Sequence, residues 1–347
     1  MKKAFMVLMA AALCMAMAAP LFAGGEKEAA KPTGPVNIGI YVPGVAAGSP
    51  LYEQLVSGAQ KAAAEFPSIT LKVVEGGFNQ AEWPEKVTSM VASGEYAYLL
   101  TSNPSLPAIC VEVAKQFPKQ KFICMDGYLA GNPQFYTVMY NQVEQGYMAG
   151  YLAGLVTKSA MTGATPDLKV GAIVAQEYPA LTLEMIPGYT QGFKAVDSGI
   201  TLDYRVIGNW YDANKAADLA NSMMDQGVDV ILAIAGGAGQ GIIKAAQARG
   251  RYVVYFDSNV YKLAPGTIIG CATLDQERAV YETLKKVMQG TLAFGKADVV
   301  ASKAGYVDFA DKDPLYTDNV SADVRAKMAD LMKKFRSGEL TLPVPQM

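Results

Sequence analysis

The sequence predicts an α/β fold built as two doubly wound lobes with parallel sheets, and two observations carry that prediction. Short runs rich in Val and Ile alternate with segments in which Ala, Leu and Met recur at three-and-four spacing, which is typical of strands alternating with helices. The pattern also occurs twice. The segments "ITLKVVEGGFNQAEW" and "ITLDYRVIGNWYDANKA" begin at Ile69 and Ile200, and Asp126 and Asp257 end matching strands, so both pairs are 131 residues apart (200 − 69 and 257 − 126).

The first copy contains four apolar runs that predict strands, separated by segments with helical spacing. Its strands are expected near 36–42, 69–75, 97–101 and 120–125, and its helices near 51–65, 82–93 and 107–117. The second copy repeats this order, with strands near 168–174, 200–207, 228–234 and 252–256 and helices near 181–196, 213–226 and 239–249. Because helices separate the strands, the strands of each copy are expected to run parallel.

The two copies are joined by a segment, "YTVMYNQVEQGYMAGYLAGLVTKSAM", whose small residues suit a tightly packed crossover helix. After the second copy, "GTIIGCATLDQERAVYETLKKVM" repeats the strand-then-helix order, so the chain is expected to cross between the lobes more than once. We therefore predict one lobe from residues 36–141 plus about 257–290 and a second from 142–256 plus about 291–347. Several crossovers between two lobes form hinges.

The first residues have the layout of a secretory signal. In "MKKAFMVLMAAALCMAMAAPLFA" two lysines precede a long apolar run that ends at small residues, which predicts a signal over residues 1–23 and a flexible tether over 24–35. Cys14 leaves open a lipid anchor, although Leu13 stands where lipoprotein processing needs a small side chain. After cleavage no other apolar run approaches the roughly 20 residues that a bilayer requires, so the chain is expected to be exported. Two α/β lobes, several crossovers and export together indicate a solute-binding protein of the type I periplasmic kind.

The composition excludes several classes of function. The sequence contains no histidine, which removes Ser-His and Cys-His nucleophiles and most zinc sites, so neither an enzyme nor a metal centre is expected. Without Lys2 and Lys3 there are 28 basic and 32 acidic residues, a net charge of −4 with no basic patch, which argues against nucleic acid as a partner. Cys110, Cys124 and Cys271 lie in apolar runs and are expected to be buried thiols, with a Cys110–Cys124 bridge left open. We expect a monomer.

A ligand is expected outside the carboxyl ends of the strands, where the two lobes face each other. The turn after the second strand of each copy carries aromatic and amide side chains, and the fourth strand of each copy ends in an aspartate. Aromatic faces from both lobes could clamp a flat ring, while carboxylates and amides accept or donate hydrogen bonds. These turns supply the candidates Phe78, Asn79, Asn103, Asp126, Tyr178, Asn209, Trp210, Tyr211, Gly236, Gly237, Gln240 and Asp257.

Simpler interpretations apply to three neighbouring features. Asp212 suits the N-cap of the helix that follows it. Trp83, next to Pro84, suits the core side of its helix. The stretch "AGGAGQG" suggests a dinucleotide-binding loop, but its third glycine is misplaced for that fingerprint, and a helix N-terminus whose bare N–H groups approach a ligand explains it better.

The segments "GYMAGYLAG", "DVILAIAGGAGQGIIKAA" and "YFDSN", together with the export signal, resemble the basic membrane protein family of ABC-transporter receptors, which includes purine nucleoside receptors. Within it, "YVPGVAAGSPLY", "VIGNWYDANKAADLA" and "SGELTLPV" look most like the riboflavin-binding receptors of spirochaetes. The resemblance implies permease and ATPase subunits as partners. It also places Tyr52, Asp126, Trp210 or Tyr211, Gly236, Gly237 and Asp257 where the family's ligand contacts lie.

Two departures from the nucleoside branch favour riboflavin. Pro50-Leu51-Tyr52 replaces an acidic segment after the first strand, and Leu274-Asp275 stands where that branch uses a lysine. The resemblance therefore predicts riboflavin as the transported ligand, not as a cofactor, with amides such as Asn79, Asn103 and Gln240 on the ribityl hydroxyls. A purine nucleoside receptor of the same fold is the alternative. A nucleoside hydrolase that uses Asp126 and Asp257 as its carboxylate pair is a third, less favoured hypothesis.

Overall fold

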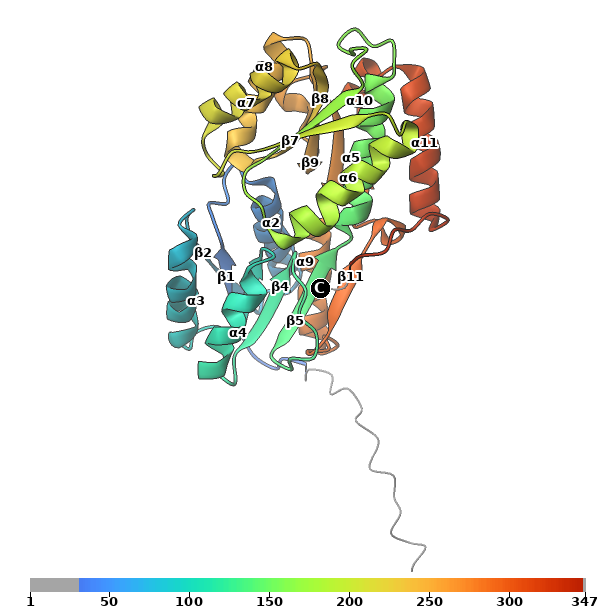
Figure 1. Cartoon of the computed structure of the whole chain (residues 1–347). Coiled ribbons are helices and arrows are strands. Elements are labelled where there is room, and N and C mark those ends of the chain that lie inside the picture. The colour runs from blue at the N-terminus through green and yellow to red at the C-terminus, as the bar shows by residue number, and fades with distance from the viewer. Residues whose placement is uncertain (1–30, 346–347) are drawn as a thin grey trace, which may run out of the picture.

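In the computed structural model, which describes residues 31–345, the strands form two six-stranded sheets (Figure 1). The predicted signal over 1–23 and most of the tether lie outside the described residues. The first sheet has the order β2-β1-β3-β4-β5-β11, and the second repeats it as β7-β6-β8-β9-β10-β12. Neighbouring strands are parallel throughout, except that β12 runs antiparallel to β10. The prediction of two doubly wound parallel lobes is confirmed.

The strand bounds show how closely the two copies correspond. The first sheet contains β1 (Val36–Val42), β2 (Ile69–Glu75), β3 (Tyr98–Ser102), β4 (Lys121–Met125), β5 (Phe135–Tyr140) and β11 (Ala297–Val300). The second contains β6 (Lys169–Val174), β7 (Thr201–Val206), β8 (Val228–Ile234), β9 (Tyr252–Asp257), β10 (Ile268–Leu274) and β12 (Val307–Phe309). The central strands are buried along almost their whole length, as expected when helices cover both faces.

The helices cover both faces of each sheet (Figure 1). The first lobe carries α2 (Pro50–Glu65), α3 (Trp83–Ala92), α4 (Leu106–Gln116) and α9 (Gln276–Gln289). The second carries α5 (Gln142–Thr157), α6 (Ile186–Val196), α7 (Ala213–Asp225), α8 (Gly239–Ala248), α10 (Pro314–Asn319) and α11 (Ala322–Ser337). Of the short turns, η1 (Gln80–Glu82), η3 (Gly236–Ala238) and the π-helical η2 (Leu181–Met185) bear on the site.

The chain crosses between the lobes three times, after β5, after β10 and after β11. Two predicted boundaries move as a result. Residues 268–274 form β10 beside β9 in the second lobe, whereas the sequence predicts about 257–290 in the first. Residues 297–300 form β11 beside β5 in the first lobe, whereas the sequence predicts about 291–347 in the second. The second crossover therefore falls near residue 275, after β10, because β10 pairs with β9 and so belongs to the second lobe.

The crossover helix α5 packs closely on α6 because both helices carry glycine at the contact. A Cβ at Gly150 would lie 1.9 Å from the carbonyl oxygen of Tyr189, and one at Gly146 would lie 2.3 Å from that of Met185. In return, a Cβ at Gly192 would lie 2.2 Å from the carbonyl oxygen of Tyr147. The small residues noted in the sequence are thus required by the close approach of two helix backbones.

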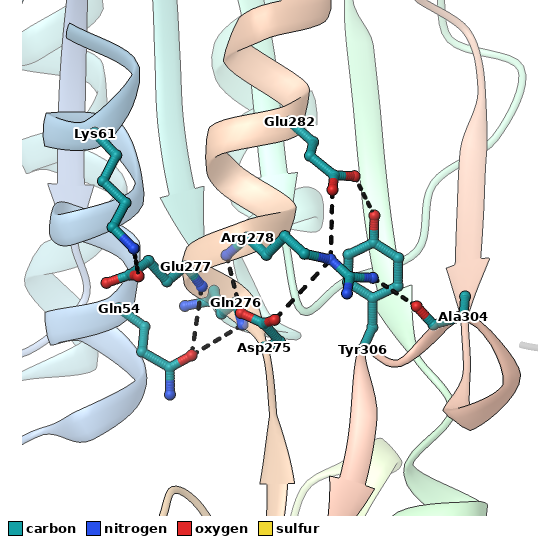
Figure 2. Close-up of polar contacts among 9 residues, drawn as sticks. All are labelled: Gln54, Lys61, Asp275, Gln276, Glu277, Arg278, Glu282, Ala304 and Tyr306. Carbon is teal, nitrogen blue, oxygen red and sulfur yellow. Dashed lines mark hydrogen bonds and ion pairs between the residues drawn. The ribbon is translucent and has the colours of Figure 1, made fainter. Parts of the chain in front are cut away.

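Figure 2 shows how the second crossover is held. The side-chain oxygen of Gln54 on α2 accepts hydrogen bonds from the backbone N–H of Gln276 at 2.9 Å and of Glu277 at 3.4 Å, which caps the N-terminus of α9 (Figure 2). Arg278 lies over the ring of Tyr306, 3.8 Å from its centroid, and donates to the carbonyl oxygen of Ala304 at 2.6 Å. Because residues 304–306 follow β11, this cluster joins the second crossover to the third.

The three cysteines in the described part of the chain are free and buried. A hydrogen bond between the Cys110 and Cys124 thiols, together with burial, raises the pKa of Cys110, so the two thiols are neighbours without a bridge. Between residues 31 and 345, none of the helices combines the length and apolarity needed to cross a membrane.

Candidate functional site

A cavity of about 450 Å³ lies at the carboxyl ends of the strands of both sheets. This size is within the usual range for small-molecule sites. Nine of the predicted site residues line it: Tyr52, Phe78, Asn103, Asp126, Tyr178, Trp210, Gly236, Gly237 and Asp257. Four do not line it: Asn79, Asn209, Tyr211 and Gln240. Lining residues that the sequence analysis did not single out include Gln80, Gln142, Gln176, Glu177, Met185 and Tyr255.

Aromatic side chains from both lobes face this cavity. Phe78 follows β2 in the first lobe, and in the second the rings of Tyr178 and Trp210 lie with centroids 6.3 Å apart at an interplanar angle of 35°. Trp210 is fixed from two sides, because its Nε1 donates to Gln176 Oε1 at 2.9 Å and its carbonyl oxygen accepts from the N–H of Ala238 at 3.0 Å. These rings are placed to hold a flat group between the lobes.

The turn after β8 requires glycine beside Trp210. Gly236 has φ of +52°, and a Cβ there would lie 3.2 Å from Trp210 Cε3. Its lack of a side chain lets the indole lie against the start of η3, and both Gly236 and Gly237 expose backbone to the cavity. The two glycines therefore expose backbone to the cavity, as the sequence predicts, and Gly236 also makes room for the indole ring of Trp210.

The four predicted residues outside the cavity have other local partners or exposed positions. Asn79 accepts from the N–H of Ala81 at 3.3 Å, and Asn209 accepts from the N–H groups of Tyr211 and Asp212 at 3.1 and 2.7 Å. Asparagine after a strand commonly bonds its own turn in this way, which turns the amide from the cleft. Gln240 is exposed on the first turn of α8.

Tyr211 is 66 % exposed and meets Phe78 of the other lobe at the mouth of the cleft, with ring centroids 6.4 Å apart. Beside this pair, Gln80 Nε2 donates to Gln176 Oε1 at 3.1 Å, which also joins the lobes. The mouth is therefore bridged by one ring contact and one amide pair. Gln80, one residue beyond the predicted Asn79, is the amide of this turn that reaches the cleft.

Two simpler interpretations are confirmed. Asp212 caps α7, since its side chain accepts from the N–H of Lys215 at 2.9 Å. Trp83 is only 4 % exposed and packs in the core of the first lobe, where its Nε1 donates to the carbonyl oxygen of Gly77 at 2.9 Å, and it also contributes to the lining of the cavity.

The two strand-end aspartates face the cavity with the same unusual backbone. Asp126 and Asp257 have φ of +53° and +71°, in the left-handed region that non-glycine residues seldom adopt. Gln142 Nε2 donates to Asp126 Oδ1 at 3.3 Å, and Gln145 Nε2 donates to Asp257 Oδ1 at 3.0 Å. Burial, together with the charge of Asp257, raises the pKa of Asp126 well above its usual range. Burial also raises the pKa of Asp257, to about 6, while the bond from Gln145 opposes that rise.

The charge of the lining selects among ligand classes. Lysine and arginine are missing from the lining residues, whereas Asp126, Glu177 and Asp257 contribute to it. The residues from 31 to 345 also form no cluster of metal-ligating side chains. The cavity is therefore suited to an uncharged molecule that donates hydrogen bonds, and it disfavours phosphates.

Most of the chain matches a single family of known proteins. Residues 35–340 fit the family model described as Bmp, ABC transporter substrate-binding protein PnrA-like. The chain belongs to the Bmp family. Its fold and family are those of the substrate-binding proteins of ABC transporters, as the resemblance predicted.

Curated relatives of this Bmp-family chain include binding proteins and a basic membrane protein of several bacteria. It is 25 % identical to an ABC transporter nucleoside-binding protein of Lactococcus lactis over 72 % of this chain and 71 % of the relative. It is 24 % identical to basic membrane protein A of Borreliella burgdorferi, with 66 % of each chain covered. It is 26 % identical to a purine-binding protein of Brucella abortus over 66 % of this chain and 61 % of the relative.

Solved structures agree on the fold of this Bmp protein. An ABC transporter solute-binding protein of Aeropyrum pernix superposes with a TM-score of 0.79 at 20 % identity, covering 90 % of this chain and 94 % of that one. A second, from Conexibacter woesei, gives a TM-score of 0.65 at 21 % identity, covering 89 % and 99 %. At these identities the likeness concerns the fold alone.

Proposed function

We propose that this protein is the exported, monomeric receptor of an ABC importer and that it binds riboflavin between its lobes, without catalysing a reaction and without a bound cofactor. The permease and ATPase of the importer are its expected partners. The signal-like segment over residues 1–23 supports export, and Cys14 leaves a lipid anchor open. The observation that carries the ligand assignment is the cavity itself, which combines aromatic walls from both lobes with two aspartates and lacks a cationic lining.

Each part of riboflavin finds a suitable surface in this cavity. The three-ring isoalloxazine is wide and flat, and Phe78 on one side with Tyr178 and Trp210 on the other offers rings from opposite lobes. The ribityl chain carries several hydroxyls, for which Asp126 and Asp257 provide acceptors. Stacking contributes about 0.5–1.5 kcal/mol per aromatic pair beyond simple burial, and hydrogen bonds to charged groups contribute about 1.5–3 kcal/mol.

A purine nucleoside is the second candidate, because two relatives carry names that refer to nucleoside or purine binding. A purine ring could use the same aromatic faces, and a ribose could use the same carboxylates. Against it, residues 50–52 are Pro-Leu-Tyr at the start of α2, and Tyr52 occupies the cavity where the nucleoside branch is expected to place an acid. Tyr52 accepts a hydrogen bond from Asn103 at 3.3 Å, so this corner offers an uncharged phenol.

Titration calorimetry of the purified, ligand-stripped protein tests the assignment. We expect riboflavin to bind with a dissociation constant in the nanomolar to micromolar range. In a parallel fluorescence titration, stacking on the aromatic side chains should quench the flavin emission. Flavin mononucleotide should bind at least tenfold more weakly, since its phosphate would meet acidic side chains without a cation. If inosine or guanosine binds and riboflavin does not, the ligand of the receptor is a purine nucleoside and the riboflavin assignment is wrong. Release of a free base from a nucleoside during incubation would contradict the receptor function and favour the hydrolase.

A further inference from the structure

The first turn of α5 is an unusual concentration of buried polar side chains. Asn141, Gln142, Glu144 and Gln145 are each 4 % exposed or less. They follow directly on β5, where the chain first crosses between the lobes. Buried polar groups need partners, and the partners of these four residues lie in both lobes and in the segments that connect them.

The two glutamines of this turn reach the two strand-end aspartates. Gln142 and Gln145 are three positions apart and so lie on one face of the helix. Gln142 Nε2 donates to Asp126 of the first lobe at 3.3 Å, and Gln145 Nε2 donates to Asp257 of the second at 3.0 Å. Gln142 lines the cavity, whereas Gln145 lies behind Asp257 and does not.

Gln145 is held in one orientation by a second bond. It is fully buried, and its Nε2 also donates to the carbonyl oxygen of Ala272 on β10 at 3.0 Å. Its Oε1 is buried with no hydrogen-bond partner among the described residues. The Gln145 amide therefore donates two hydrogen bonds, one to the Asp257 carboxylate and one to the carbonyl oxygen of Ala272, while its oxygen stays without a partner among the described residues.

The other side of the same turn holds the remaining connections. Glu144 accepts from the N–H of Ser302, just after β11, at 2.9 Å and from the N–H of Leu342 at 3.3 Å. Asn141 Nδ2 donates to the carbonyl oxygen of Leu342 at 2.8 Å. One helical turn is therefore bonded to the third crossover, to the C-terminal segment and to both aspartates.

We propose that Gln142 and Gln145 are positioning residues, each of which holds one ligand-facing aspartate so that a carboxylate oxygen is presented to the ligand. Gln145 acts on Asp257 and Gln142 on Asp126, and the turn that carries both glutamines joins the aspartates to the crossovers. The inference rests on the proposed function in one respect, which is the identity of the ligand that contacts the two aspartates. The hydrogen bonds join protein groups alone, which allows the positioning role and the proposed function to be tested apart.

The test compares Gln145→Met and Gln142→Met with Gln120→Met. Gln120 is a matched control, because it is buried and donates to backbone carbonyls of the first lobe away from the cavity. With riboflavin as the probe, or inosine if the wild-type protein binds that instead, we expect about tenfold to a hundredfold weaker binding for the first two variants. The control should retain wild-type affinity. Wild-type affinity in both test variants would overturn the inference.

A measurement without ligand separates positioning from a general loss of structure. Carbon-detected NMR of protein labelled at the aspartate carboxyls follows the titration of Asp257, whose pKa of about 6 the bond from Gln145 holds down. Gln145→Met should move this titration to higher pH, while Gln142→Met and Gln120→Met should leave it in place. Asp126 and the tyrosines Tyr52, Tyr140, Tyr178 and Tyr255 also face Asp257. Burial raises the pKa of each of these tyrosines, so below pH 8 only the carboxyls titrate.

The outcomes are distinguishable. If the Asp257 titration shifts in Gln145→Met but neither riboflavin nor a nucleoside binds the wild-type protein, the positioning role stands and the proposed function fails. If the titration does not shift, the positioning role of Gln145 is refuted whatever the ligand. A double-mutant cycle of Gln145→Met with Asp257→Asn adds a check that a purely structural role would not satisfy, because the two losses of affinity should not add.

Discussion

Glu184 is a buried acid whose removal should stabilise the protein in a pH-dependent way. It lies in the π-helical turn η2 beside α5, is 0 % exposed, and neither carboxyl oxygen has a hydrogen-bond partner among the described residues. Burial raises the pKa of its carboxyl from 4.5 to about 7. Because the folded state holds this proton more tightly than the unfolded chain, stability falls as pH rises from 4.5 to about 7 and is level above that.

The magnitude follows from the size of the pKa shift. A shift from 4.5 to about 7 corresponds to about 3 kcal/mol of lost stability once the group is ionised. Most of that loss, about 2.5 kcal/mol, falls between pH 5 and pH 8. In Glu184→Gln this loss is absent, so the free energy of unfolding of the variant relative to the wild type should rise by about 2.5 kcal/mol over that interval. For a chain of this size this is a relative gain in Tm of about 4 °C.

Thermal unfolding followed by circular dichroism at pH 5, 6, 7 and 8 measures this difference. Comparing how the two proteins change with pH cancels any constant effect of the new amide. It also cancels the contribution of Asp257, whose raised pKa acts in the same direction in both proteins. The charge of Glu184 helps to raise the pKa of Asp126, so losing that charge in the variant adds to the relative gain. A Tm difference that stays constant from pH 5 to pH 8, or that shrinks, would refute the reasoning.

Two further predictions concern packing and ligand contact. Gly150→Ala should lower the free energy of unfolding by about 1–3 kcal/mol or more, because its Cβ would lie 1.9 Å from the carbonyl oxygen of Tyr189. In denaturant titrations Gly34→Ala, which adds a Cβ with nothing within 4 Å, should match the wild type, and equal midpoints for the two variants would contradict the account. Trp210→Ala should weaken ligand binding at least tenfold in calorimetry, whereas Tyr211→Ala, at a side chain 66 % exposed outside the cavity, should change it less than about threefold. The reverse order would assign the stacking ring to Tyr211.

The duplication makes much of the fold and site predictable. Because the period of 131 residues aligns strand ends as well as strands, Asp126 and Asp257 can be paired from the amino-acid sequence alone, and both have left-handed backbone at the cavity. The short strands β5, β11 and β12 escape prediction. β5 continues into a helical segment, while β11 and β12 have only four and three residues, too few to show a period.

The positions missed within the site have a different physical cause. Gln142 and Gln145 lie in the first turn of α5, where sequence pattern shows only that they are polar residues at the start of a buried helix. Their contacts with the strand ends arise from the way α5 packs after the crossover. Asn79 and Gln80 are adjacent amides, and only the local turn decides that Asn79 bonds backbone while Gln80 faces Gln176. A periodic pattern specifies faces and ends of elements, but side-chain direction in a loop depends on the dihedral angles of single residues.

The contacts that join the lobes at the mouth are too weak to hold the cleft shut by themselves. The exposed amide pair Gln80–Gln176 contributes about 1 kcal/mol at most, and the tilted Phe78–Tyr211 pair about as much. Two contacts that together contribute about 2 kcal/mol would both be broken in a few per cent of the molecules, so we expect the mouth to open often enough for a ligand to enter. A ligand that bonds Asp126 in one lobe and Asp257 in the other adds its differential affinity to this small bias. The same two aspartates are bonded to the first turn of α5, where the chain first crosses between the lobes. We therefore expect closure to require that the ligand engages both lobes at once.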